Sequence, residues 1–160
     1  MATRCVITIR DKHGKEYSIY RHNDGYPEGV VSDLHLLSLF YKRNPIDNPE
    51  YFLANFIFYA KLSFWMDDHK IYKVTEDEVW KSWEYGYGVC ASNQEFKCIV
   101  PRHLDYRYLI YPKDDEVMLK IEMFSFTAMD FETIFDGKLE RAFEKYANGK
   151  GCHLKPDLLS

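Results

Sequence analysis

Residues 5–21 read CVITIRDKHGKEYSIYR, and this stretch decides the fold class of the chain. Its two halves alternate apolar and polar residues, the period-two pattern of β-strands, on either side of the polar residues 11–15. Gly14 accepts the positive φ that a tight loop between antiparallel strands needs. The stretch therefore predicts a β-hairpin, with Cys5, Ile7 and Ile9 sharing one face of its first strand.

Two helices are predicted after this hairpin. The first is amphipathic, with Val30, Leu34, Leu37 and Tyr41 at helical spacing, and Asn44-Pro45 ends it because the residue before proline leaves the α region. The second begins with Asn48 as N-cap and Pro49 at the first helical position. Its buried stripe consists of Leu53, Phe56, Ile57, Ala60 and Phe64.

Phe52, Phe58 and Tyr59 lie outside the stripe of the second helix. Two explanations remain open, because such a helix is either covered on two sides or offers an aromatic surface to another molecule. We favour cover on two sides, which is the commoner arrangement.

The second half of the chain has a weaker pattern up to about residue 101. Residues 105–123 then predict a second hairpin around the polar turn 113–116, and residues 131–135 lead to a last helix at 139–146. We therefore expect an α+β fold in one domain, residues 1–160, with residues 150–160 as a C-terminal tail. Its antiparallel sheet is built from two hairpins, and about three helices lie mainly on one face.

Composition indicates a folded protein and excludes some function classes. Hydrophobic residues make up 46% of the chain and aromatic residues 17%, which is far more apolar material than a disordered protein carries. The formal net charge of -4 disfavours nucleic-acid binding, because little affinity would come from counterion release at phosphates. A local basic face remains conceivable, and its candidates are Lys97, Arg102 and Arg107.

The chain is expected to stay in the cytoplasm. No apolar run approaches the roughly 20 residues that span a bilayer, and the first ten residues lack the features of a signal peptide. The four cysteines are expected to be reduced thiols, because this compartment is reducing. None of them forms a Cys-x-x-Cys pair, so we expect no metal, and we also expect no cofactor. They are Cys5, Cys90, Cys98 and Cys152.

The loop at residues 22–29 is the best candidate for a site. His22, Asp24 and Glu28 combine an imidazole with carboxylates, which suits general acid–base chemistry or cation binding. A structural interpretation explains the loop equally well, with Asp24 in an Asx turn and Gly25 in the left-handed region. We favour the structural interpretation, because turn chemistry accounts for these residues without a substrate.

The segment from Tyr20 to Glu28 also resembles a family. Its Tyr-x-His-x-Asp-Gly-Tyr-Pro-Glu signature is similar to that of small uncharacterised proteins of bacteria and their phages. Weaker matches occur where that family has a Tyr-Gly piece, an Asp-x-x-Tyr strand and an acidic-aromatic segment, here at residues 87–88, 105–108 and 130–137. The resemblance implies a bacterial or phage origin and brings no activity with it.

Two further groups of residues are candidates for a site. His103 and Asp105 fall two residues apart on one face of a strand, and cross-strand pairing is the simpler explanation for them. The aromatic candidates for ligand binding are able to stack on a base or a sugar, although a core cluster explains them better. They are Tyr20, Tyr26, Trp80, Trp83, Tyr85 and Tyr87.

The sequence leaves two functions open. The first is a non-catalytic binding protein, carried by a phage or mobile element, that occupies a host protein or a small ligand. Negative charge, an excess of aromatic residues and the lack of a familiar enzyme signature motivate it. The alternative is an enzyme or nucleotide-handling protein that uses the loop of His22, Asp24 and Glu28.

Overall fold

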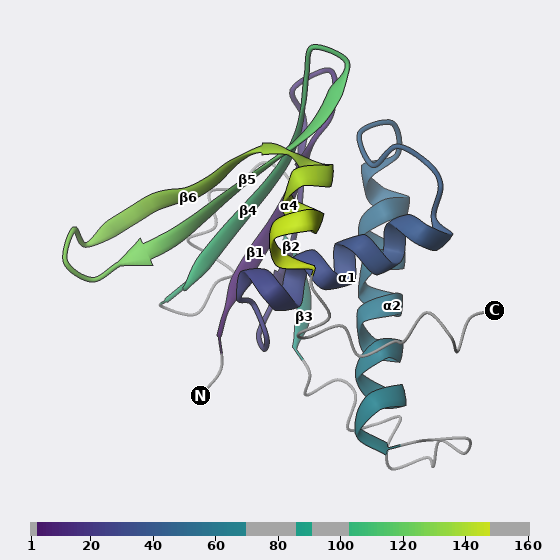
Figure 1. Ribbon diagram of the computed structural model, residues 1–160, viewed down its shortest axis with the longest axis horizontal. Coiled ribbons are helices and arrows are strands. Elements are labelled where there is room, and N and C mark those ends of the chain that lie inside the picture. Colours follow the sequence, from purple (N-terminus) through teal and green to yellow (C-terminus); the bar gives the residue numbers. More distant parts are fainter. Residues whose placement is uncertain (1–2, 70–85, 91–102, 148–160) are drawn as a thin grey trace.

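The computed structural model describes residues 3–69, 86–90 and 103–147 of the chain. Within them lie three helices (Figure 1), which are α1 (Pro27–Phe40), α2 (Pro49–His69) and α4 (Leu139–Tyr146). The strands are β1 (Cys5–Arg10), β2 (Glu16–Arg21), β3 (Tyr87–Cys90), β4 (Tyr106–Lys113), β5 (Glu116–Ser125) and β6 (Asp130–Lys138). No helix in the described ranges is long and apolar enough to cross a membrane.

The strands form one mixed sheet in the order β3-β2-β1-β4-β5-β6. The α+β class is confirmed, but the expectation of a purely antiparallel sheet is wrong because β1 and β4 are parallel. Each of these two strands begins a hairpin, and the long connection that contains α1 and α2 brings the second hairpin back in the same direction. The remaining neighbouring pairs are antiparallel, and two of them, β1–β2 and β4–β5, are the predicted hairpins.

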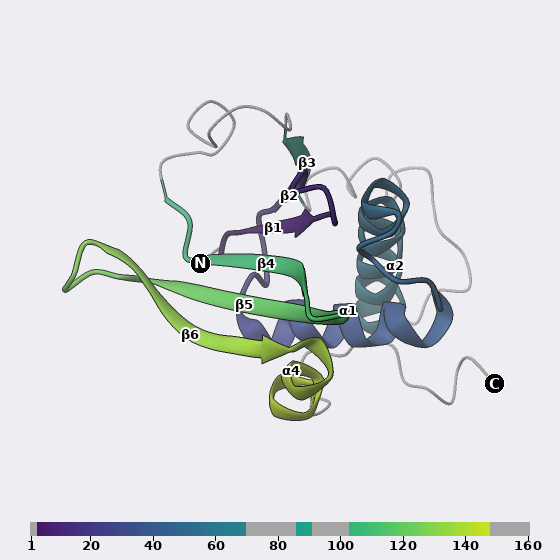
Figure 2. The ribbon, with the colours of Figure 1, turned by 90° about the horizontal axis from the view of Figure 1, so that it is seen from above.

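The helices pack on one face of this sheet. Cys5, Ile7 and Ile9 are fully buried on that face and belong to the same core cluster as residues from α1, α2 and α4. Figure 2 shows the helices gathered along one side of the strands. The opposite face, which we call the open face, carries no helix among the described residues.

The two helices predicted after the first hairpin, α1 and α2, are both present. The burial of the aromatic residues of α2 differs in part from the prediction. This helix begins at Pro49, as expected, and Phe52 is buried. Phe58 is 60% exposed, so the cover on two sides that we favoured is wrong at this position. Tyr59 is half-buried and stacks on Phe40, with their ring centres 5.6 Å apart.

The second hairpin and the last helix are confirmed, and β6 is an unexpected addition. The β4–β5 turn places Asp114 and Asp115 at φ values of 51° and 61°, which is typical of a two-residue type I′ turn. Residues 131–135 belong to β6 and pair with β5 instead of merely leading to α4. The register of this pairing shifts between Ile121 and Glu122 of β5, where a bulge occurs. The shift disturbs the period-two alternation of β6 by which a strand is predicted.

Candidate functional site

The signature loop between β2 and α1 is fixed by main-chain contacts. The amide of Gly25 donates to the carbonyl oxygen of Thr3 at 2.9 Å, and the hydroxyl group of Tyr108 donates to the carbonyl oxygen of Gly25 at 2.7 Å. A Cβ atom at Gly25 would lie 2.7 Å from the Thr3 oxygen and 2.9 Å from the Cβ of Cys5. Glycine is therefore needed here for a close approach of two chain segments.

One detail of the structural interpretation is wrong. The positive φ of the loop belongs to Asp24, at 53°, and not to Gly25. Asp is among the few non-glycine residues that adopt this conformation readily. Within the described residues no hydrogen bond joins the Asp24 carboxylate to the backbone, so the expected Asx turn is not formed there.

The catalytic candidates of the loop are not joined by hydrogen bonds or ion pairs among the described residues. His22 accepts or donates through Nδ1 to the hydroxyl group of Tyr20 at 2.8 Å. Glu28 lies in the first turn of α1, where a carboxylate favours the positive end of the helix dipole. Within residues 3–69, 86–90 and 103–147, no hydrogen bond or ion pair joins His22, Asp24 and Glu28.

The second candidate pair is also separated. His103 is exposed and precedes β4, whereas the carboxylate of Asp105 accepts a hydrogen bond of 2.7 Å from the backbone amide of Arg4. The amide of Asp105 in turn donates to the carbonyl oxygen of Arg4. Asp105 therefore extends the pairing between β1 and β4, which is a structural role.

The aromatic candidates fall in different places. Burial raises the pKa of Tyr20, which lies in β2, and of Tyr26, which lies in the loop directly before α1. Burial likewise raises the pKa of Tyr87, whose ring has an edge contact with Phe56 of α2 and packs against the core. Trp80, Trp83 and Tyr85 lie outside the described residues, as do Lys97 and Arg102 of the suggested basic face.

A buried ion pair lies beneath the loop. Nη1 of Arg21 is 2.6 Å from Oδ2 of Asp33, and the two side chains are 7% and 4% exposed. Arg21 also donates to the carbonyl oxygen of Asn23 and faces the ring of Tyr87. Although burial opposes its charge, the carboxylate of Asp33 raises the pKa of Arg21, so the guanidinium stays protonated.

The cysteines and the possible metal ligands among the described residues were also candidates for chemistry. Cys5 is a free, fully buried thiol, and burial raises its pKa to about 12. In the part of the chain that the structure describes, no group of three or more His, Cys, Asp or Glu side chains could hold a metal ion. Cys98 and Cys152 lie outside the described residues.

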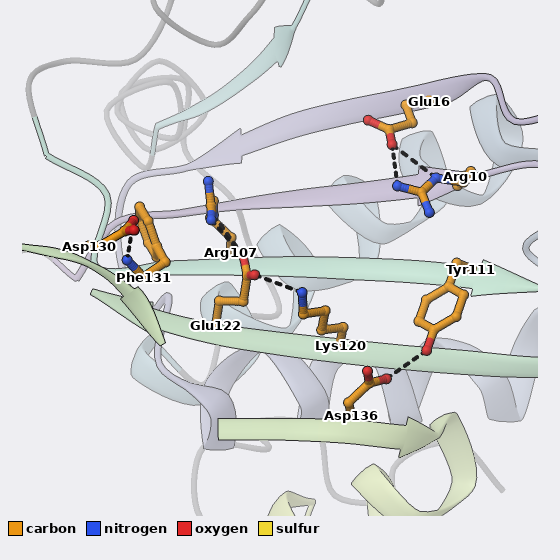
Figure 3. A network of polar contacts seen from close by, with 9 residues as sticks. All are labelled: Arg10, Glu16, Arg107, Tyr111, Lys120, Glu122, Asp130, Phe131 and Asp136. Carbon is orange, nitrogen blue, oxygen red and sulfur yellow. Dashed lines mark hydrogen bonds and ion pairs between the residues drawn. The ribbon is translucent and has the colours of Figure 1, made fainter. Parts of the chain in front are cut away.

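A charged hollow lies on the open face, and Figure 3 shows the charged side chains that line it. Its volume is about 270 Å³, and Val6, Thr8 and Leu109 contribute to its lining. The charged side chains that line it come from four strands, and they are Arg10, Glu16, Arg107, Lys120 and Glu122. Arg10 pairs with Glu16 at 2.7 Å, while Arg107 and Lys120 both pair with Glu122, at 2.8 and 2.9 Å.

An apolar cluster continues from this hollow into the end of the β5–β6 hairpin, residues 123–132, which we call the hairpin end. The guanidinium of Arg107 lies 3.9 Å from the centre of the Phe131 ring. Phe124 has edge contacts with Phe131 and Phe126 at 5.4 and 5.2 Å. Both ribbon views show the hairpin end reaching away from the helices.

The hairpin end exposes much of its apolar surface. Phe126 is 74% exposed and Met129 is 72% exposed, and both lie in the turn between β5 and β6. Turns are ordinarily polar, so two large apolar side chains at a turn form a candidate contact surface for another molecule. This is the signal by which the sequence analysis could have found the hairpin end.

Among the charged residues of the hollow, only Arg107 is a candidate from the sequence, as part of the suggested basic face. Lys120 and Glu122 alternate with the buried Leu119 and Ile121, which is the ordinary pattern of a half-buried strand. Arg10 joins them only because β1 lies beside β4 in the folded sheet. No local signal predicts that pairing.

Comparison with known proteins returns no relatives. No protein-family model matches the chain, and searches of the curated proteins and of the solved structures find no significant match. The resemblance of the Tyr20–Glu28 signature to small bacterial and phage proteins therefore stays a prediction.

Proposed function

We propose that the chain is a non-catalytic binding protein that occupies a host protein through its hairpin end. In this proposal it is encoded by a phage or mobile element and works in the cytoplasm of a bacterial host cell. The origin rests on the resemblance of the Tyr20–Glu28 signature alone.

The observation that favours a binding role is the exposure of Phe126 and Met129 in the turn between β5 and β6. Aromatic residues, Met and Arg are enriched at the centres of protein interfaces. Burying one such apolar side chain contributes about 1.5–3 kcal/mol. The two side chains together would therefore raise the affinity for a partner by roughly two to four orders of magnitude.

The hairpin end is also preorganised, which favours binding over simple exposure. Phe131 is held between Phe124 and the guanidinium of Arg107, and the amide of Ala128 donates to the hydroxyl oxygen of Ser125 within the turn. Groups that are already ordered lose less conformational entropy when a partner binds.

The loop of His22, Asp24 and Glu28 gives the enzyme alternative less support. Its backbone bonds to Thr3 and Tyr108 through Gly25, and no hydrogen bond or ion pair among the described residues joins its titratable side chains to one another. A catalytic acid and base must both reach the reacting group. We therefore retain binding as the proposed function.

Site-specific photo-crosslinking in bacterial cells tests this proposal. A benzophenone amino acid in place of Phe126 should form an adduct with one defined host protein, and Met129→Ser should reduce its yield. The matched control places the same group at Phe58, which is similarly exposed but lies on α2. Identical adducts from both positions, or none from position 126, would overturn the proposal.

A further inference from the structure

We infer that the bound partner inserts an acidic side chain into the charged hollow, beside an apolar side chain that rests on the hairpin end. This inference rests on the proposed function and specifies its partner as an acidic–apolar peptide segment. It follows from the charge of the hollow, the exposure of its cations, its volume and its continuity with the hairpin end.

The hollow is locally cationic on an acidic protein. Three cationic side chains line it, those of Arg10, Arg107 and Lys120, against two carboxylates, so its formal charge is +3 − 2 = +1. The whole chain has a formal net charge of -4. An acidic segment would therefore be attracted to this part of the surface and repelled by much of the remainder.

Two of the three cations are also better placed to meet a partner than the carboxylate that they share. The side chains of Arg107 and Lys120 are 43% and 34% exposed, whereas that of Glu122 is 19% exposed. Glu122 therefore lies deeper and holds both cations from one side. The outward side of each cation remains accessible to a second carboxylate, with which Arg and Lys form charge-assisted hydrogen bonds.

The size of the hollow suits a side chain. Its volume of about 270 Å³ lies at the low end of the range of roughly 300–1,000 Å³ that is typical of small-molecule pockets. The hydroxyl groups of Thr8 and Ser18 are bonded to each other at 2.7 Å, so they are already satisfied on this face. A short carboxylate side chain fits both the volume and the available donors.

The hollow and the hairpin end form one continuous surface. Glu122 contacts Arg107, whose guanidinium covers Phe131, and Phe131 contacts Phe124 next to the exposed Phe126. A single extended segment can therefore place one side chain on each part. Segments with an acidic residue near an aromatic or aliphatic residue match this arrangement.

Selection from a random peptide library against the full-length protein tests the inference. The selected peptides should be enriched in Asp or Glu close to a Phe, Leu or Met, and raised salt should weaken their binding. The double variant Arg10→Gln/Lys120→Gln changes the formal charge of the hollow from +1 to -1. It should bind a selected peptide about tenfold less tightly, because two exposed ion pairs with the peptide are lost.

The matched control is Lys12→Gln/Lys113→Gln, which removes the same charge from two exposed positions outside the hollow. It should leave peptide affinity unchanged, and thermal unfolding should show that both double variants fold. Peptides without acidic enrichment, equal losses in both double variants, or no selected peptide would overturn the inference. A dimer that Phe126→Ser dissociates would also overturn it, because a second copy would then be the occupant.

Different results would contradict the proposed function and the insertion of an acidic side chain. A crosslinked host protein at position 126 that binds both double variants equally well would support the proposed function and contradict the insertion of an acidic side chain. Absence of any crosslinked protein would remove the proposed function itself, whatever peptides the library yields.

Discussion

The hydroxyl group of Tyr108 donates a hydrogen bond of 2.7 Å to the carbonyl oxygen of Gly25 and so joins the central strand β4 to the loop before α1. Tyr108 is 1% exposed, so water cannot replace this contact. Tyr108→Phe leaves a buried acceptor without its donor and should lower the free energy of unfolding by about 1–3 kcal/mol. Urea denaturation measures the loss.

Tyr111→Phe is the control for this prediction, because Tyr111 lies on the same strand and donates to Asp136 at 2.6 Å in an exposed position. There water takes the place of the lost partner, so the change should stay within about 0.5 kcal/mol. Equal losses in the two variants would contradict the role assigned to Tyr108.

The close approach at Gly25 predicts a second difference in stability. Gly25→Ala brings a methyl group against backbone and Cβ atoms that cannot move freely, and it should cost about 1–3 kcal/mol. Gly88→Ala meets nothing nearer than 3.8 Å and should stay within about 0.5 kcal/mol. Urea midpoints decide the matter, and a tolerated alanine at Gly25 would show that the loop moves away from Thr3.

Parts of the fold that depend on neighbouring residues were predictable from the sequence. The hairpin of residues 5–21, the start of α2 at Pro49 and the helix Leu139–Tyr146 follow from local periodicity and capping. The parallel pairing of β1 with β4 joins residues about 100 positions apart, and nothing in either strand alone selects that neighbour. β6 was missed because it is polar and pairs irregularly.

The candidate site was less predictable for the same reason. Sequence patterns singled out His22, Asp24 and Glu28, where turn residues concentrate. In the structure that loop connects β2 to α1 and is bonded to Thr3 and Tyr108. The hollow is assembled from four strands, so its charges converge only after folding. Phe126 and Met129 were visible as apolar residues, but their turn was not recognised because β6 was not expected.

The buried ion pair predicts a large effect from a single substitution. Arg21→Met removes the guanidinium that pairs with the buried carboxylate of Asp33 and should destabilise the protein by about 3–5 kcal/mol. Arg10→Met breaks a pair of similar length whose side chains are 42% and 40% exposed, and it should cost no more than about 1 kcal/mol. Similar urea midpoints for both variants would show that Arg21 has access to water.

The buried thiol of Cys5 predicts that stability falls at alkaline pH. Burial raises its pKa from 9.0 to about 12, so above pH 9 the unfolded chain has released a proton that the folded chain retains. The free energy of unfolding then decreases with rising pH until the folded thiol also ionises, near pH 12. Between pH 8 and pH 10.5 this group should account for about 2 kcal/mol of the decrease.

Urea denaturation of the native protein and of Cys5→Ala at these two pH values isolates that contribution. The native protein should lose about 2 kcal/mol more than the variant, because the buried tyrosines contribute equally to both. Equal losses would mean that Cys5 ionises as readily in the folded protein as in the unfolded chain, which its complete burial opposes.

The exposed side chains of the hairpin end should matter for binding and not for folding. Phe126→Ser removes a ring that is 74% exposed, so the free energy of unfolding should change by no more than about 0.5 kcal/mol. Affinity for the crosslinked partner should fall by about thirtyfold, since a central interface residue contributes about 2 kcal/mol or more. Phe58→Ser, at a similarly exposed position of α2, should change neither quantity. A loss of stability in Phe126→Ser as large as the loss of affinity would mean that the ring serves the hairpin itself, through its contact with Phe124, rather than a partner.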